Sequence, residues 1–376
     1  MRQPSLTLIV KTSSACNMAC SYCDADIYSR RRMPFEVLAS LTAKALGTGR
    51  PAQFIWHGGE PLLLGQEFYR KALWLQEHYR RENQFVSNSI QTNATLLNDE
   101  WIDIFDDGNF SVGVSLDGPA ELHDSNRVLR NGTGTFHKAM RGISLLKARN
   151  QRFGVLAVVT EETIKLGARK FFDFYLDNGL TDIALLSLKP VLIKGGKGHL
   201  PRESSSHSEF VNDIFDIWYE MDDPGVHIRD FESIMRVLLG GEHSICLLAG
   251  QCIGQDFAIN FNGDFYHCDE FMTDSDYRLG NIVEHDMKTL LEGSRIKALI
   301  KSEEANLRNL TCNWKSVCNG GCPKDRYVAA RLGGGGPVLC CGYANLIEHI
   351  SARIIENPQV ARLKLGHPAG LGTGRA

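Results

Sequence analysis

Short apolar runs alternate with amphipathic stretches along the first half of the chain. The β-prone runs that favour strands lie at 6–10, 53–56, 84–91, 111–115, 153–159 and 183–188. Between them, apolar residues recur at helical spacing at 34–46, 99–106, 134–148 and 166–178. Strands and helices that alternate in this way predict an α/β fold with a parallel sheet. In such sheets ligands bind at the carboxyl ends of the strands.

The second half begins with helical patterns at 210–221 and 231–239. Alternating residues at 257–267 surround an Asn262-Gly263 pair, which predicts a β-hairpin. We expect this ribbon to hold Cys252 and Cys268 near opposite ends. The Gly-, Lys- and Ser-rich stretch 191–207 is interpreted as a loop over a substrate site, and the tail after Pro358 as disordered.

Cysteine placement changes this picture from a plain α/β protein to one with metal centres. Three of the eleven cysteines lie at 16–23, directly after the first apolar run, and the other eight lie between Cys246 and Cys341. A closed zinc site needs four ligands, usually as paired C-x2-C units, whereas Cys16 and Cys20 are separated by three residues. Three thiolates on a four-iron cluster would leave one iron open to a substrate or cofactor. Two cysteine regions predict two cofactor regions.

Length and charge exclude several classes of protein. With 376 residues the chain is long enough for two domains, and its net charge of −3 gives no sign of a nucleic-acid surface. No apolar run approaches the roughly 20 residues that span a bilayer, and the first residues have too short an apolar core for a signal peptide. We therefore expect a cytoplasmic protein that binds neither nucleic acid nor membrane.

The spacing C-x3-C-x-aromatic-C, formed by Cys16, Cys20, Tyr22 and Cys23, resembles the signature of radical S-adenosylmethionine (SAM) enzymes. The resemblance implies a [4Fe–4S] cluster on the three cysteines, with SAM at its open iron. It also implies a partial (βα)6 TIM-like barrel. The alternative is a structural thiol cluster or zinc knuckle.

Turns after the next three predicted strands resemble the SAM contacts of that family. Gly58, Gly59 and Glu60 match the GGE motif that holds the methionyl amino group, since glycines let the backbone approach a ligand and a carboxylate pairs with an ammonium. Further contacts implied by the resemblance are Asn93 near the cofactor, Ser115 and Asp117 on the ribose, and Arg127 on the SAM carboxylate. The alternative for each of these segments is a polar turn that binds nothing, and the alternative for Arg127 is a surface salt bridge.

The later cysteines resemble the SPASM extension, which carries two auxiliary clusters in enzymes that modify peptides. By this resemblance the first auxiliary [4Fe–4S] cluster is held by Cys246, Cys252, Cys268 and Cys322, and the second by Cys312, Cys318 and Cys340. One position departs from the pattern, because Asn309 stands where a cysteine is expected. Cys341 or a non-cysteine ligand would then supply the missing contact, or one iron of the second cluster would be open. The chain would carry one or two auxiliary clusters. Structural zinc is the alternative for this region.

Together these resemblances predict a radical SAM core domain at 1–230, a SPASM domain at 231–345, and a C-terminal helix with a disordered tail at 346–376. Reductive cleavage of SAM would give a 5′-deoxyadenosyl radical that abstracts a hydrogen atom from a peptide or protein substrate. An auxiliary cluster would accept the second electron. Asp269, next to Cys268, would be the general base; the alternatives are a turn residue or a hydrogen-bond acceptor for an amide that supports the cluster. Flavodoxin or ferredoxin would supply the electrons.

We favour crosslink formation in a ribosomally made peptide. Three alternatives remain open. The first is sulfatase maturation, in which Ser or Cys becomes formylglycine. The second is modification of a small metabolite, including sulfur insertion. The third is a non-catalytic iron–sulfur electron carrier, which would have no need of a SAM pocket.

Overall fold

A computed structural model of the chain describes residues 5–23, 25, 27, 30–188, 205–221, 223–250, 252–332 and 342–366, with the backbone alone at 329–332. The chain divides into two compact units. Unit 1 consists of Met1–Ser115, Asp124–Phe153 and Gln251–Ser302, and unit 2 of Leu116–His123, Gly154–Gly250 and Glu303–Ala376. Each unit is therefore assembled from segments that lie far apart in the sequence.

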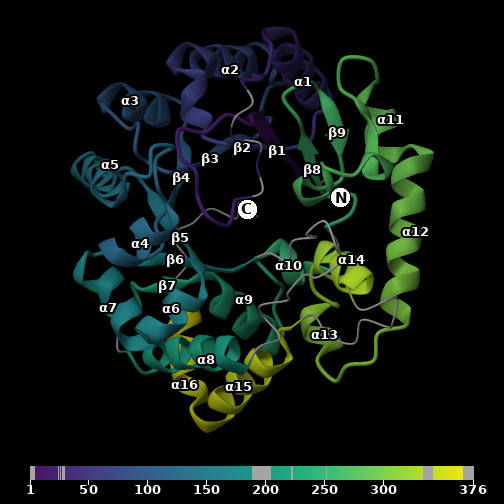
Figure 1. Ribbon diagram of the computed structural model, residues 1–376. Coiled ribbons are helices and arrows are strands. Elements are labelled where there is room, and N and C mark those ends of the chain that lie inside the picture. The colour runs from purple at the N-terminus through teal and green to yellow at the C-terminus, as the bar shows by residue number, and fades with distance from the viewer. Residues whose placement is uncertain are drawn as a thin grey trace. The chain divides into compact units, whose positions relative to one another are not determined.

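Unit 1 alternates strands and helices in its first segment. Its strands are β1 (Leu6–Ser13), β2 (Ala52–Gly58), β3 (Val86–Thr92), β4 (Phe110–Ser115), β8 (Asp256–Ile259), β9 (Asp264–Tyr266) and β10 (Arg278–Asn281). Its helices are α1 (Phe35–Gly47), α2 (Gln66–Tyr79), α3 (Asp99–Asp107), α5 (Phe136–Ala148) and α11 (Met287–Glu292), with short 3-10 turns at Pro61–Leu64, Asp269–Phe271 and Ser275–Tyr277. Helices α4 (Ala120–Asn126) and α12 (Ser294–Arg308) contain a boundary between the units. Figure 1 shows α1, α2 and α3 outside the strands of this unit.

The strands of unit 1 lie in the order β10-β9-β8-β1-β2-β3-β4. The five strands from β8 to β4 run parallel, with register partners such as Leu8 and Phe54. Both of these side chains are fully buried, which explains why the strands read as apolar runs in the sequence. Parallel strands place their carboxyl ends at one edge, so the turns that follow β1, β2 and β3 meet there.

The predicted hairpin is confirmed, but the expectation about its cysteines is wrong. Strands β8 and β9 pair antiparallel, with Ala258 opposite Tyr266 and a turn at Gly263. Cys252 precedes β8 and Cys268 follows β9, so both lie at the open end of the hairpin. An antiparallel pair joined by a tight turn necessarily brings its first and last residues to the same end.

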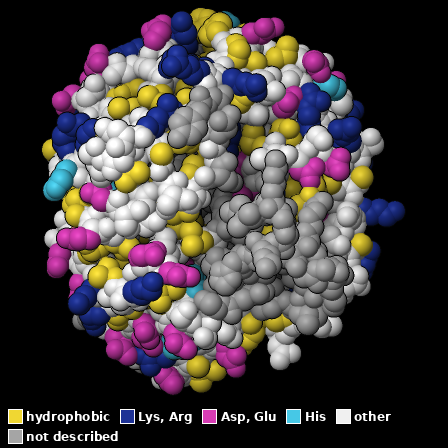
Figure 2. Space-filling view, viewed as in Figure 1, with side chains coloured by type: hydrophobic (Ala, Val, Ile, Leu, Met, Phe, Trp, Pro, Cys, Tyr) yellow, Lys and Arg dark blue, Asp and Glu magenta, His cyan; other side chains and the backbone are white. Residues whose placement is uncertain are grey.

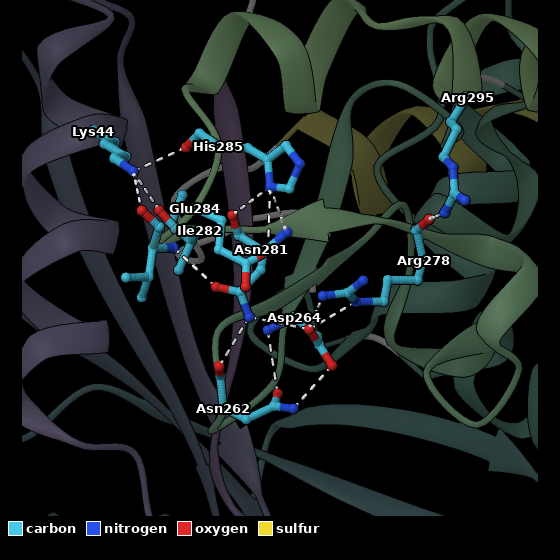
Figure 3. A network of polar contacts seen from close by, with 10 residues as sticks. Lys44, Asn262, Asp264, Arg278, Asn281, Ile282, Glu284, His285 and Arg295 are labelled. Carbon is cyan, nitrogen blue, oxygen red and sulfur yellow. Dashed lines mark hydrogen bonds and ion pairs between the residues drawn. The ribbon is translucent and has the colours of Figure 1, made fainter.

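A polar network fastens this hairpin to α1 (Figure 3). The Lys44 ammonium, on α1, donates to the carbonyls of Ile282 (2.6 Å), Val283 (3.1 Å) and His285 (2.9 Å) beyond β10. A second set of contacts joins β9 to β10 and to the hairpin turn. The Asp264 carboxylate accepts from Arg278 (2.6 Å) and Asn281 (3.1 Å) on β10, and from Asn262 (2.8 Å) in the turn. The turn end of the hairpin is thereby held in a defined place within unit 1.

Unit 2 contains three parallel strands in the order β5-β6-β7. They are β5 (Phe153–Val159), β6 (Asp182–Ser187) and β7 (His227–Ile228). Its helices are α6 (Glu161–Leu166), α7 (Ala168–Asp177), α8 (Ser205–Glu220), α9 (Arg229–Leu238), α10 (Cys246–Ala249), α13 (Lys315–Cys318), α14 (Pro323–Leu332), α15 (Ala344–Glu356) and α16 (Pro358–Gly366). Helix α15 packs against α8 and α9 around the buried rings of Phe215, Trp218 and Phe231.

One expectation for unit 2 is confirmed and one is corrected. The helix predicted at 166–178 is α7, and the short helix α6, which was not predicted, precedes it with Gly167 at φ +89° between the two. The tail predicted to be disordered after Pro358 is helical to Gly366, where Ala361 is fully buried and Lys364 donates to the Asp223 carbonyl (3.1 Å). Residues 367–376, and all of the predicted loop 191–207 before Ser205, lie outside the described residues.

Within the described residues, no helix is both long enough and apolar enough to cross a membrane. On the face drawn in Figure 2, acidic and basic side chains are interspersed rather than gathered by sign. This agrees with the small net charge of −3.

Candidate active site

The three cysteines predicted to bind the first cluster lie in the loop after β1, at the carboxyl edge of the sheet. Cys16 is buried, Cys20 is half-buried and Cys23 is exposed. The Cys23 amide donates to the Cys20 carbonyl (3.1 Å), so these two residues share one turn. Among the described residues, no three Cys, His, Asp or Glu side chains are placed to hold a single metal ion. A four-iron cluster binds each thiolate at a different iron and needs its ligands further apart.

The surroundings of Cys16 fit a metal-bound thiolate. Burial, assisted by the negative charge of Glu60, raises the pKa of its thiol to about 12. The amide of Met18 (3.4 Å) and the side-chain amide of Asn93 (4.0 Å) both donate to the sulfur, which favours the thiolate. A thiol with so high a pKa keeps its proton unless a cation replaces it, as iron does. The donor set therefore fits an iron–sulfur cluster.

The two glycines of the GGE turn make room for the cysteine loop. The amides of Gly59 and Glu60 donate to the carbonyls of Ser13 and Ala15, both at 2.8 Å. A Cβ on Gly58 would stand 2.3 Å from the Ser13 oxygen, and a Cβ on Gly59 would stand 2.2 Å from the Ala15 oxygen. Sequence analysis attributed these glycines to the approach of a ligand. The structure gives them a second reason, which is the approach of the loop that carries the cysteines.

The carboxylate of Glu60 joins the turn after β2 to the end of β3. It is almost fully buried, and it accepts from the Leu62 amide (3.0 Å), the Thr92 hydroxyl (2.8 Å) and the Asn93 amide (2.8 Å). Burial raises its pKa to about 7, although these three hydrogen bonds oppose the rise. A carboxylate offers about four lone-pair positions, so one remains for a cationic group such as an ammonium.

Asn93 also reaches the cysteine loop. Its side-chain amide donates to the Asn17 oxygen (2.9 Å), and its own oxygen accepts from the Thr95 hydroxyl (2.7 Å). Asn17 in turn donates to the Thr95 hydroxyl (2.8 Å), which closes a ring of three side chains. Sequence analysis missed Asn17 and Thr95. The only signal was their polarity inside motif segments, which does not reveal a partner nearly eighty residues away.

The predicted ribose contacts lie at the end of β4, which is Ser115, and just after it, at Asp117. In unit 1, the Ser115 hydroxyl accepts from the Gln91 side chain (3.0 Å) at the end of β3. In unit 2, Asp117 is fully buried, and its carboxylate accepts from the Val158 amide (3.1 Å). The Asp117 amide donates to the His123 ring (3.3 Å). Both predicted residues therefore have structural partners, and their contact with a ribose stays a prediction.

Residues 126–130, of which only Arg127 was singled out from the sequence, form a brace against the cysteine loop. The Ala19 amide donates to the Val128 carbonyl (2.8 Å), and the Ser21 amide donates to the Asn126 carbonyl (2.9 Å). The Ser21 hydroxyl also bonds the Asn126 side chain (2.6 Å). The brace and the loop therefore form a short antiparallel pair.

Two arginines of this brace reach into the loop. Arg127 lies against the Cys20 sulfur (4.0 Å), with its guanidinium carbon 5.4 Å from the centre of the Tyr22 ring. Arg130, which sequence analysis missed, donates to the Cys16 carbonyl (2.5 Å). Both arginines contact the loop that holds the cysteines. The predicted contact between Arg127 and the SAM carboxylate stays a prediction.

Asp269 lies at the open end of the hairpin, in a cluster of polar groups from β1 and β2. Its carboxylate forms an ion pair with the Lys11 ammonium (2.9 Å) and accepts from the Cys268 thiol (3.7 Å). The same ammonium bonds the ring of His57 (3.1 Å), and Lys11 and His57 are register partners on neighbouring strands. The carboxylate is thus held at the carboxyl edge of the sheet, where the cysteine loop begins.

The structure places the remaining predicted ligands in both units. Cys252 and Cys268 belong to unit 1, while Cys246, Cys312, Cys318 and Cys322 belong to unit 2. Cys318 is buried, and its sulfur accepts from the Gly320 amide (3.4 Å). Cys340 and Cys341 lie outside the described residues.

Unit 2 has a cavity next to one of these cysteines. Its volume is about 530 Å³, and its lining residues are Gly250, Leu307, Cys312, Asn313, Lys315, Ser316 and Asn319. Asn309, which stands in place of an expected cysteine, is exposed just after α12, and its amide donates to the Asn306 carbonyl (3.3 Å). The composition of the second auxiliary cluster stays a prediction.

Two segments of the chain match known families. Residues 10–166 match the radical SAM superfamily, and residues 246–323 match SPASM, an iron–sulfur cluster-binding domain. The first segment includes the cysteine loop, the GGE turn and the brace. The second begins at Cys246 and ends directly after Cys322.

Two curated relatives are similar over nearly their whole length. A cysteine-type anaerobic sulfatase-maturating enzyme of Clostridium perfringens is 32% identical over 366 residues, which cover 94% of this chain and 98% of the relative. A serine-type anaerobic sulfatase-maturating enzyme of Bacteroides thetaiotaomicron is 32% identical over 381 residues, which cover 93% and 90%.

Solved structures agree with these relatives. Native anSMEcpe with bound AdoMet and Cp18Cys peptide has a TM-score of 0.84 and 30% identity, covering 96% of this chain and 99% of that one. Streptococcus suis SuiB bound to S-adenosylmethionine has a TM-score of 0.59 and 16% identity, covering 86% and 74%, which shows the fold alone. The predicted fold class, a partial barrel with a cysteine-rich C-terminal extension, is confirmed.

Proposed function

Because the chain belongs to the anaerobic sulfatase-maturating enzymes, radical SAM enzymes with a SPASM domain, we propose that it oxidises a Cys or Ser side chain of a peptide to formylglycine. The observation that carries this proposal is 32% identity to maturases over nearly the whole of both chains. The similarity supports this alternative better than the crosslink that sequence analysis put first. The crosslink rested on a domain arrangement that many peptide-modifying enzymes share.

Cys16, Cys20 and Cys23 would hold the cluster of the core domain, and the later cysteines would hold the auxiliary ones. When bound, these clusters would supply electron transfer, both the electron that reductive cleavage of SAM needs and an acceptor for the electron that the substrate loses. We propose that flavodoxin or ferredoxin supplies the electrons. The division into a core domain that ends at 230 and a SPASM domain that ends at 345 also stays part of the proposal.

The chain's own residues would then bind SAM and manage the substrate proton. Glu60 offers a buried carboxylate to the methionyl ammonium, while Asn93 and Arg127 support the loop beside it. After loss of a hydrogen atom and an electron, the substrate carbon of a Ser residue releases its hydroxyl proton and becomes an aldehyde. A Cys residue gives a thioaldehyde, which water converts to the aldehyde with release of hydrogen sulfide. We propose that Asp269 accepts the proton that the substrate hydroxyl or thiol releases.

A peptide assay tests the proposal. Reconstituted protein is given SAM, a strong reductant and a Cys-x-Pro-x-Arg peptide, or the same peptide with Ser or Ala at the target position. We expect the Cys or Ser peptide to become reactive toward a hydrazide probe, and the Ala peptide to stay unchanged. Loss of two hydrogen atoms without hydrazide reactivity would instead support a crosslink and contradict the proposal.

Asp269 and Lys11 give a prediction about the second half of the reaction. Asp269→Asn should leave SAM cleavage intact but impair aldehyde formation, because an amide cannot take the proton. Lys11→Met should lower aldehyde formation about tenfold, since the ion pair that orients the carboxylate is lost, and Lys11→Arg should restore part of it. Cleavage is measured as 5′-deoxyadenosine and oxidation as aldehyde. Full aldehyde yield from Asp269→Asn would remove its role as base.

Glu60 gives a prediction about pH. Because burial raises its pKa to about 7, most of the ligand-free protein carries a protonated Glu60 below that pH. A nearby ammonium favours the ionised form, so SAM binding should release a proton. We expect SAM affinity to rise by up to about tenfold per pH unit up to the pKa of Glu60 and to level off above it. Calorimetry in buffers of different ionisation enthalpy measures the released proton. A pH-independent affinity, or a dependence that Glu60→Gln retains, would contradict this account.

A further inference from the structure

Arg127 lies directly opposite Cys20 in the antiparallel pair between the brace and the cysteine loop. The pair is fixed by the bridge between Met18 and Leu129 and by amide bonds on either side of Cys20. In this register the residue opposite Cys20 is Arg127. Residues directly opposite each other across antiparallel strands bring their side chains together.

Three further contacts restrict the guanidinium. Arg127 is largely buried, its guanidinium carbon lies 5.4 Å from the centre of the Tyr22 ring, and its Nη1 atom lies 4.0 Å from the Cys20 sulfur. The carbonyl of Arg127 accepts from the buried Thr135 hydroxyl (2.7 Å), which holds its backbone. Ordering a long arginine side chain costs conformational entropy, and here the platform of Tyr22 limits the positions it can take.

We propose that Arg127 raises the reduction potential of the cluster bound by Cys16, Cys20 and Cys23. A buried positive charge and an N–H donor aimed at a ligand sulfur stabilise the more negative, reduced form over the oxidised form. The step is the uptake of one electron by the oxidised cluster from a reductant such as dithionite, and no bond is made or broken. The inference rests on the proposed cluster at these cysteines, and it is independent of what the substrate becomes.

The proposal differs from a contact with the SAM carboxylate in one respect. A residue that acts only on SAM changes SAM affinity and leaves the potential of the SAM-free cluster unaltered. A residue that acts on the Cys20 sulfur changes that potential before SAM is bound. The SAM-free potential therefore separates the two roles.

The experiment is a potentiometric titration of the full-length, reconstituted protein without SAM, followed by electron paramagnetic resonance. The signal of this cluster is identified as the one that Cys20→Ala removes. Arg127→Gln removes the charge, and Arg127→Lys keeps the charge but loses the planar fork of donors. Arg149→Gln is the matched control, because it removes an exposed arginine whose partners are Asp99, Asp103 and Asp106.

At a fixed solution potential, Arg127→Gln should lower the ratio of reduced to oxidised cluster about tenfold, which corresponds to about 59 mV for a one-electron couple. Arg127→Lys should shift in the same direction by less, and Arg149→Gln should match the wild type. An unchanged midpoint in Arg127→Gln with full iron content would overturn the inference. If Arg127→Gln cannot retain the cluster, the midpoint of Arg127→Lys decides in the same way. The absence of any signal that depends on Cys20 would overturn both this inference and the proposed cluster.

Discussion

Cys20→Ala is expected to abolish formation of 5′-deoxyadenosine from SAM, down to the background of the assay. Cys20 is the middle cysteine of the loop, and its backbone carbonyl accepts the Cys23 amide. Alanine keeps this backbone contact and removes the sulfur alone. Two thiolates cannot hold a cluster that needs three, so the variant lacks the cluster that would donate an electron to SAM.

The measurement pairs 5′-deoxyadenosine with iron and sulfide per chain. In Cys20→Ala we expect iron to fall by the content of one cluster, because the auxiliary ligands are untouched. Cys252→Ala is the matched control. It should lose auxiliary iron, since Cys252 is a proposed ligand of the first auxiliary cluster, yet retain SAM cleavage because the three cysteines of the loop are unchanged. Wild-type cleavage in Cys20→Ala would end the assignment of the cluster to this loop.

The elements that sequence patterns predicted well are those with a regular local spacing of apolar residues. Strands β1 to β6 and helices α1, α3 and α5 were all predicted to within a few residues, because β-prone runs and helical spacing are both visible within a short window of sequence. Helix α2 was missed, because exposed charged and aromatic side chains interrupt its apolar stripe. The tail after Pro358 was predicted to be disordered because its last residues are rich in glycine, yet its first part forms α16, with proline at the first position of the helix, where proline is favoured.

The candidate site shows a similar division. The cysteine loop and the GGE turn were found because each motif is a run of unusual residues that is local in sequence. Arg130 and Asn17 were missed because each contacts a partner far along the chain, and no local pattern encodes such a pair. The chemistry of the site was therefore visible in the sequence, whereas the side chains that hold it in place were not.

The turn after β2 belongs to both groups, because it carries a recognisable motif and also holds the cysteine loop in place. Gly59→Ala should detach the cysteine loop from the sheet. The new Cβ would stand 2.2 Å from the Ala15 oxygen and 2.4 Å from the Ser14 oxygen, both of which are backbone atoms that cannot rotate away. Overpacking of this kind costs about 3 kcal/mol of unfolding free energy and forces the backbone to shift.

We expect Gly59→Ala to lose most of the iron bound by the loop and to unfold at lower denaturant concentration, because the amides of Gly59 and Glu60 both bond carbonyls before Cys16. Iron per chain and the unfolding midpoint measure the two effects. Gly47→Ala is the control, since a Cβ there meets nothing within 4 Å and alanine favours the helix. A Gly59→Ala protein with full iron content and an unchanged midpoint would mean that the loop moves freely relative to the sheet. In that case the glycines would be needed for the ligand alone.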